Sequence, residues 1–230
     1  MIRAGGTVAA AGPLSLPAKA WRWIEMALMF GAAPLVMHWV VQGEKIPIFV
    51  ALLPVLAIAV LMLIADPTFQ LRQELTRRIS WRNALSIAVV FAVAGGFATW
   101  WVRTHHPEWF LEFPTSRPET YKRIMLLYPL FSVAAQELVY RTFYFHRYGP
   151  LFGEQAWLAV VANGLLFGFA HIVVRSEFAI VATALGGMLL ASRYVVSRSY
   201  WVVFIEHTIW GWLIFTIGLG RYFFTGVSNL

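Results

Sequence analysis

Three polar side chains that could do chemistry lie close together in an otherwise apolar part of the chain. The segment AAQELVYRTF carries Gln136, Glu137 and Arg141 between long apolar runs. On a helix, Glu137 and Arg141 are four residues apart and share a face, so they can form an ion pair. Gln136 lies roughly 100° around the helix from Glu137 and can face another helix or a cavity. A structural ion pair between helices explains the same residues without a catalytic role.

A second apolar stretch, NGLLFGFAHIVV, places a histidine on a face that contains small residues. Gly164, Phe167, Gly168 and His171 follow helical spacing and form one stripe. Two glycines four residues apart let another helix approach closely, so the stripe is predicted to face protein and not lipid. A buried histidine with its hydrogen bonds satisfied is the structural alternative.

A third apolar stretch, FIEHTIWGW, contains Glu206 beside His207, with Gly211 one turn later. A polar contact between helices explains each stretch alone, but one shared internal site explains all three together. A carboxylate with two histidines, in a chain without cysteine, is suited to activating water. One histidine could stabilise the oxyanion that develops on an attacked carbonyl.

The same groups could instead hold a metal ion. Two histidines and a carboxylate form a catalytic zinc set, and the ligands would be His171, His207 and Glu137. The sequence lacks the H-E-x-x-H pattern, so no motif supports zinc. We therefore expect a site without a cofactor or metal and keep zinc as the alternative.

The elements that must position these groups are strongly apolar. The 230 residues are 60% apolar and 13% charged, whereas soluble proteins have roughly 45–50% and about 25%. A helix needs about 20 apolar residues to cross the ~30 Å hydrocarbon layer. The sequence predicts an all-α fold, a polytopic membrane bundle of about 7–8 transmembrane helices, with Pro34 and Pro129 able to kink or divide two of them. The predicted spans are 21–42, 46–65, 83–102, 123–146, 155–174, 178–196 and 200–220.

The remaining segments predict a simple domain organisation. Residues 1–20 are expected to be a flexible N-terminal tail, and 21–230 a single transmembrane domain whose motifs lie within 120–220. The loop 66–82 predicts a short amphipathic interfacial helix, and the proline-rich loop 103–122 predicts an irregular cap.

The basic residues predict the orientation and the surroundings. Lys and Arg are more numerous in the segments that lie on the same membrane face as the N-terminus. This excess favours a cytoplasmic N-terminus. The net charge of +7 is spread over short loops. We therefore expect contact with the lipid bilayer and no nucleic acid partner.

The three motifs, in this order and each on its own predicted helix, resemble the CPBP family of glutamate-type intramembrane proteases. This CAAX protease and bacteriocin-processing family shares the patterns Glu-Glu-x-x-x-Arg, Phe-x-x-x-His and a later His. The resemblance covers about residues 120–220. The matching residues are Gln136, Glu137 and Arg141 in the first motif, Phe167 and His171 in the second, and His207 in the third.

The resemblance implies an enzyme, an intramembrane endopeptidase (a hydrolase), and a protease domain over residues 21–230. The first glutamate of the family's pair, which is Gln136 here, would activate water with support from Glu137 and Arg141. His171 would orient the water, and His207 would contribute to the oxyanion site. Three neighbouring positions are expected to support the site: Phe167, Glu206 and Gly211.

Two of these positions depart from the family pattern. Gln136 cannot accept a proton from water, so the presumed base is missing. Three explanations are open: a glutamate has been replaced in this chain, the natural protein is an inactive relative, or Glu137 acts as the base. Gly211 stands where the family usually has Asn or Asp and lacks that amide donor. Glu206, Trp210 or a backbone N–H could compensate.

The resemblance also implies the partner. The expected substrate is a membrane-anchored protein cut near its C-terminus, in a CAAX-like tail or a C-terminal sorting signal. The short chain and its basic loop favour a bacterial inner membrane. Two alternatives remain: a non-catalytic pseudoprotease or immunity-type binding protein, and a small proton-coupled transporter.

Overall fold

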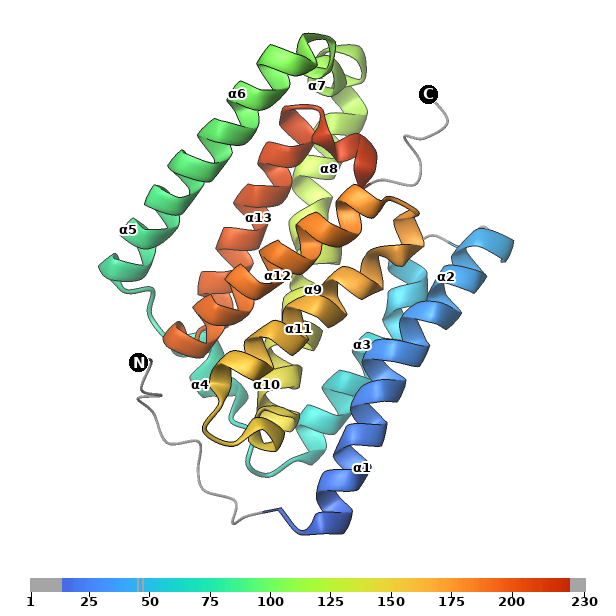
Figure 1. Ribbon diagram of the computed structural model, residues 1–230, viewed down its shortest axis with the longest axis vertical. Coiled ribbons are helices and arrows are strands. Elements are labelled where there is room, and N and C mark those ends of the chain that lie inside the picture. The colour runs from blue at the N-terminus through green and yellow to red at the C-terminus, as the bar shows by residue number, and fades with distance from the viewer. Residues whose placement is uncertain (1–13, 45, 47, 224–230) are drawn as a thin grey trace.

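Long helices lie side by side and form one bundle (Figure 1). The computed structural model describes residues 14–44, 46 and 48–223, and within them it contains helices and no strand. The all-α class predicted from the sequence is therefore confirmed. Seven helical rods can be followed through these described residues, and each overlaps one of the predicted spans.

The first three rods come from the N-terminal half. Rod one joins α1 (Leu16–Ala27), the π-helical turn η1 (Leu28–Ala32) and α2 (Ala33–Glu44). Rod two is α3 (Ile48–Ala65), and rod three joins α5 (Trp81–Val90), η2 (Phe91–Gly95) and α6 (Gly96–His105).

The other four rods carry the three motifs. Rod four joins α8 (Pro118–Tyr128), η4 (Pro129–Val133), α9 (Ala134–Glu137), η5 (Leu138–Phe143) and α10 (Tyr144–Arg147). Rod five is α11 (Ala156–Ala170) with the 3-10 turn η7 (His171–Val174). Rods six and seven are α12 (Glu177–Ser197) and α13 (Tyr200–Thr216).

Four helices within the described residues are long and apolar enough to cross a membrane by themselves. Their ranges are Leu16–Gly43, Trp81–His105, Ala156–Val174 and Glu177–Ser197. Rod two has a shorter apolar stretch, α13 has only 17 residues, and rod four carries the ionisable residues of the first motif. The protein is thus an all-helical membrane protein, and the count of about 7–8 spans stays a prediction.

Proline shapes rod four without dividing it. Pro129 has no N–H to donate, so regular i→i−4 hydrogen bonding cannot continue through it. The rod passes through the π-helical turn η4 instead, and a second π segment, η5, follows directly after Glu137. Pro34 likewise follows η1 inside an unbroken rod one. π turns are rare and frequently mark functional sites.

Glycines bring α11 and α12 into close contact. A Cβ atom at Gly164 would lie 2.8 Å from the carbonyl oxygen of Ala184, and one at Gly168 would lie 2.7 Å from that of Ile180. Such contacts leave no room for a side chain, so the two backbones approach closely. The predicted packing face on rod five is confirmed, and its neighbour is α12.

Of the two longest connecting segments, one differs from its predicted form and the other contains the predicted helix. The loop 103–122 is not irregular, because it contains the 3-10 turn η3 (Pro107–Trp109) and α7 (Glu112–Ser116), and α8 already begins within it. Proline favours the first turn of a helix, where its missing N–H costs nothing. The loop 66–82 contains a short helix, as predicted: α4 (Leu71–Thr76), with Leu71 and Leu75 exposed.

The predicted N-terminal tail also ends earlier than expected. Helix α1 begins at Leu16, where Ser15 caps its first turn and Pro17 occupies that turn. Residues 16–20 are therefore helical, and residues 1–13 of the predicted tail lie outside the described residues.

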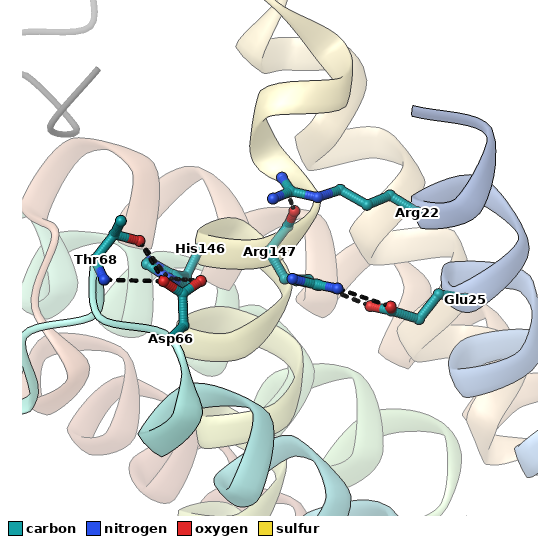
Figure 2. Close-up of polar contacts among 6 residues, drawn as sticks. All are labelled: Arg22, Glu25, Asp66, Thr68, His146 and Arg147. Carbon is teal, nitrogen blue, oxygen red and sulfur yellow. Dashed lines mark hydrogen bonds and ion pairs between the residues drawn. The ribbon is translucent and has the colours of Figure 1, made fainter. Parts of the chain in front are cut away.

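A group of polar side chains ties rods one, two and four together at the end of the bundle where α1 begins (Figure 2). We call it the end clamp; its residues are Arg22, Glu25, Asp66, Thr68, His146 and Arg147. Arg147 donates two hydrogen bonds to Glu25, at 2.8 and 2.9 Å, and Arg22 donates to the carbonyl of Arg147 at 2.9 Å. His146 contacts Asp66 at 3.1 Å. Rods far apart in the sequence are therefore joined at their ends by charge-assisted bonds.

The end clamp yields a stability prediction. Glu25→Gln removes the negative charge that Arg147 faces, so we expect a loss of roughly 1.5–3 kcal/mol in the free energy of unfolding. The measurement is thermal unfolding in detergent. Glu119→Gln is the matched control, because Glu119 forms an exposed ion pair with Lys122 that contributes little. Equal melting temperatures for the two variants would show that the end clamp does not hold the rods.

Candidate active site

A buried carboxylate joins two rods at the centre of the first motif. The His207 Nδ1–H donates to Glu137 Oε1 at 2.6 Å, and Arg141 Nε lies 3.3 Å from Glu137 Oε2. Glu137 and Arg141 are fully buried. The Arg141 contact is close but poorly aligned for a hydrogen bond, so it acts mainly as an ion pair. The predicted pairing of Glu137 and Arg141 is confirmed, and His207 is the third member.

Aromatic and backbone groups hold Arg141 in place. Its guanidinium carbon lies 4.4 Å from the centre of the Phe167 ring, and one NH2 group donates to the carbonyl of Gly187 at 3.3 Å. A cation over an aromatic face gains electrostatic stabilisation when water is excluded. Rods five and six therefore both contribute to positioning this charge.

Phe167 also connects the two histidines. Its ring centre lies 4.9 Å from that of His171 and 5.8 Å from that of His207, both in edge-to-face geometry. The His171 Nδ1–H donates to the carbonyl oxygen of Phe167 at 2.8 Å. A carbonyl can only accept, so Nδ1 of His171 carries the proton and Nε2 of the neutral ring is free to accept one.

A large cavity of about 770 Å³ lies in front of these groups. Apolar side chains from rods three, four, six and seven form most of its wall. Its volume falls within the range of typical ligand sites. Polar side chains are few on this wall and include Tyr128, Ser132, Gln136, His171 and His207.

The cavity separates the predicted site residues into two groups. Gln136, His171 and His207 line it, whereas Glu137 and Arg141 lie behind its wall. Gln136 Nε2 donates to Ser132 Oγ at 2.9 Å, and its Oε1 has no partner among the described residues. Of the two surroundings that the sequence left open for Gln136, another helix or a cavity, the structure shows the cavity. The catalytic roles of these residues stay predictions.

Glu206 does not belong to the cavity wall. It is fully buried and accepts two hydrogen bonds from Arg193, at 2.7 and 3.0 Å. Arg193 also donates to Ser86 at 2.8 Å, so this group ties rods three, six and seven together. The expectation that Glu206 could compensate for Gly211 is therefore not supported, because its carboxylate is occupied and faces another helix.

The zinc alternative does not fit the residues present. Within the described part of the chain, no group of three His, Cys, Asp or Glu side chains is arranged to hold a metal ion. Glu137 uses one oxygen for His207 and the other for Arg141, and it has no access to the cavity. His171 faces the cavity from a different rod. These three side chains do not form a ligand set.

Sequence reasoning missed several residues that shape the site. Asn163 donates to the carbonyl of Tyr140 at 2.6 Å, inside the π segment η5. The sequence could have identified Asn163, because it is a single amide in an apolar helix. Ser132 also gave a signal, since it precedes Gln136 by one turn. Tyr128 gave none, because an aromatic residue in a membrane helix is common.

These features define an all-helical membrane protein with a buried Glu–Arg–His group behind an apolar cavity. The family model described as type II CAAX prenyl endopeptidase Rce1-like matches residues 119–213. This range contains all three motifs, and it confirms the resemblance to the CPBP family for that region of the chain. No curated protein and no solved structure matches the chain.

The buried ion pair yields the next prediction. Arg141→Leu leaves the Glu137 carboxylate without its cation, and an uncompensated buried charge costs roughly 3–5 kcal/mol. We expect a lower melting temperature in detergent, together with lower activity in any active form. Arg221→Leu is the control, because Arg221 pairs with Glu112 in a partly exposed contact. An unchanged melting temperature would mean that Glu137 does not need Arg141.

Proposed function

We propose that the chain carries the framework of an intramembrane endopeptidase that hydrolyses a peptide bond near the C-terminus of a membrane-anchored protein. The observation that supports this most strongly is the contact of His207 with Glu137 at the wall of the apolar cavity. It occurs within the region that matches a family of endopeptidases.

The role proposed for His207 follows from its partner. The carboxylate of Glu137 accepts a hydrogen bond from Nδ1 and fixes the orientation of the ring. When the ring carries a proton on both nitrogens, Nε2 can donate to the oxygen of an attacked carbonyl. Arg141 compensates part of the charge of Glu137.

The base is the component that this chain lacks. Gln136 occupies the cavity wall beside Ser132, and an amide cannot take a proton from water. Glu137 is a poor substitute, because both of its oxygens are engaged and it does not reach the cavity. His171 Nε2 is the acceptor that remains on the wall. We therefore propose that glutamate at position 136 would act as base, with His171 orienting the water.

The cavity favours a substrate with an apolar anchor. Its wall is largely apolar, and its volume of about 770 Å³ is large enough for a lipid chain or several side chains of a peptide. A CAAX-like tail and a C-terminal sorting signal both place a scissile bond next to such an anchor. A bacterial inner membrane and a cytoplasmic N-terminus complete the proposal.

A second candidate function rests on Gln136 itself. If glutamine is the natural residue, the chain binds the same class of substrate and does not cut it. Such a pseudoprotease or immunity-type protein would keep the cavity and the hydrogen-bonding groups of its wall.

The deciding prediction concerns position 136. Gln136→Glu should start cleavage of a membrane-anchored reporter, because it restores a group worth roughly 10²–10⁴-fold in rate. The assay compares both forms in lipid vesicles on two reporters, one with a prenylated CAAX-like tail and one with a C-terminal sorting helix. His171→Ala in the Gln136→Glu form is the control and should abolish the gain.

Two outcomes would change this conclusion. If the Gln136→Glu form is silent on both reporters while binding them, the pseudoprotease is correct. If the chain with Gln136 is already as fast as the variant, another group is the base.

The proposed mechanism also predicts independence from metal. Activity of the Gln136→Glu form should survive 1,10-phenanthroline, since no step needs a Lewis acid. The control is chelator that has been saturated with excess zinc before it is added, because it can no longer bind a metal ion from the protein. Loss of activity that returns on adding zinc would contradict the mechanism.

A further inference from the structure

Tyr128 occupies the place where a side chain at position 211 would lie. A Cβ atom on Gly211 would be 2.6 Å from both the hydroxyl oxygen and Cζ of Tyr128. Gly211 is buried and lies one turn beyond His207 on α13. The Tyr128 ring is edge-to-face with His207, with 6.2 Å between the ring centres. The absence of a side chain at Gly211 therefore admits the phenol of Tyr128 beside His207.

The hydroxyl of Tyr128 is available for a ligand. Tyr128 lines the cavity together with Gln136, His171 and His207. Several other tyrosine hydroxyls in the described residues hydrogen-bond to protein groups: that of Tyr200 donates to the carbonyl of Ala134, for example. The Tyr128 hydroxyl has no such partner within the described residues and is not sealed from the cavity. A phenol donor with an apolar ring fixed by packing is well suited to hold a carbonyl oxygen.

We infer that Tyr128 is a second oxyanion donor, which acts beside His207 on the carbonyl under attack. This inference rests on the proposed function and extends it to a residue outside the three motifs. The O–H of Tyr128 and the Nε2–H of His207 would both point at the oxygen on which negative charge develops. The phenol keeps its proton throughout, because it donates a hydrogen bond and transfers nothing.

The kinetic test uses the Gln136→Glu form in vesicles. Tyr128→Phe keeps the ring and removes the donor, so kcat should fall roughly 10²-fold with little change in KM. Tyr121→Phe is the matched control, because it removes a hydroxyl that contacts Thr216 at 2.8 Å. A purely structural role for Tyr128 predicts a lower melting temperature and a kcat like that of the control, which would overturn the inference.

A rescue experiment tests the location of the donor. Gly211→Asn alone should disrupt the site, because its Cβ would collide with Tyr128. Tyr128→Ala opens the space but removes the donor. The double variant Tyr128→Ala with Gly211→Asn should recover at least tenfold in kcat over Tyr128→Ala, since an amide then fills the same space. If Tyr128→Phe with Gly211 unchanged has the same kcat as the double variant, the donor is not needed, which would contradict the assignment.

Binding separates this inference from the proposed function. A peptide aldehyde with an apolar tail forms a hydrate that mimics the tetrahedral intermediate, and the matched peptide alcohol does not. Tyr128→Phe in the chain with Gln136 should weaken aldehyde binding roughly five- to tenfold and leave alcohol binding unchanged. This result would support the donor even if the Gln136→Glu form proved silent. Equal loss for both ligands, or no loss, would overturn it.

Discussion

The carboxylate of Glu137 holds a cation on its own rod and a histidine on another rod inside the bundle. A charge at this depth is stable only with partners, so the positions of rods four and seven depend on each other. Phe167 packs against Arg141 and His207 and extends the same constraint to rod five. The glycine contacts then fix α12 against α11 and bring the carbonyl of Gly187 to Arg141.

This arrangement gives each charged group a separate task. Glu137 and Arg141 lie behind the wall, whereas Gln136, His171 and His207 reach the cavity. The apolar wall lowers the local dielectric, which makes each remaining donor more effective than it would be in water. The π segments on both sides of α9 alter the rotation of rod four around the first motif, so that Gln136 and Glu137 face different surroundings.

Long-range contacts corrected several expectations drawn from spacing. Glu206 and His207 are adjacent in the chain, yet one faces Arg193 and the other Glu137, because neighbours on a helix point in different directions. Glycine at position 211 suggested a missing donor, but the vacant space holds the ring of Tyr128. The loop over residues 103–122 forms short helices, since its prolines begin helical turns.

The sequence by itself determined the helical class, the positions of the apolar segments and the pairing of Glu137 with Arg141. These depend on composition and on spacing within one helix, which are local properties. Only the tertiary structure decided that His207 contacts Glu137, that His171 lines the cavity and that Tyr128 lies at Gly211. Such contacts depend on the rotation and depth of one rod against another, and these follow from packing between residues distant in the chain.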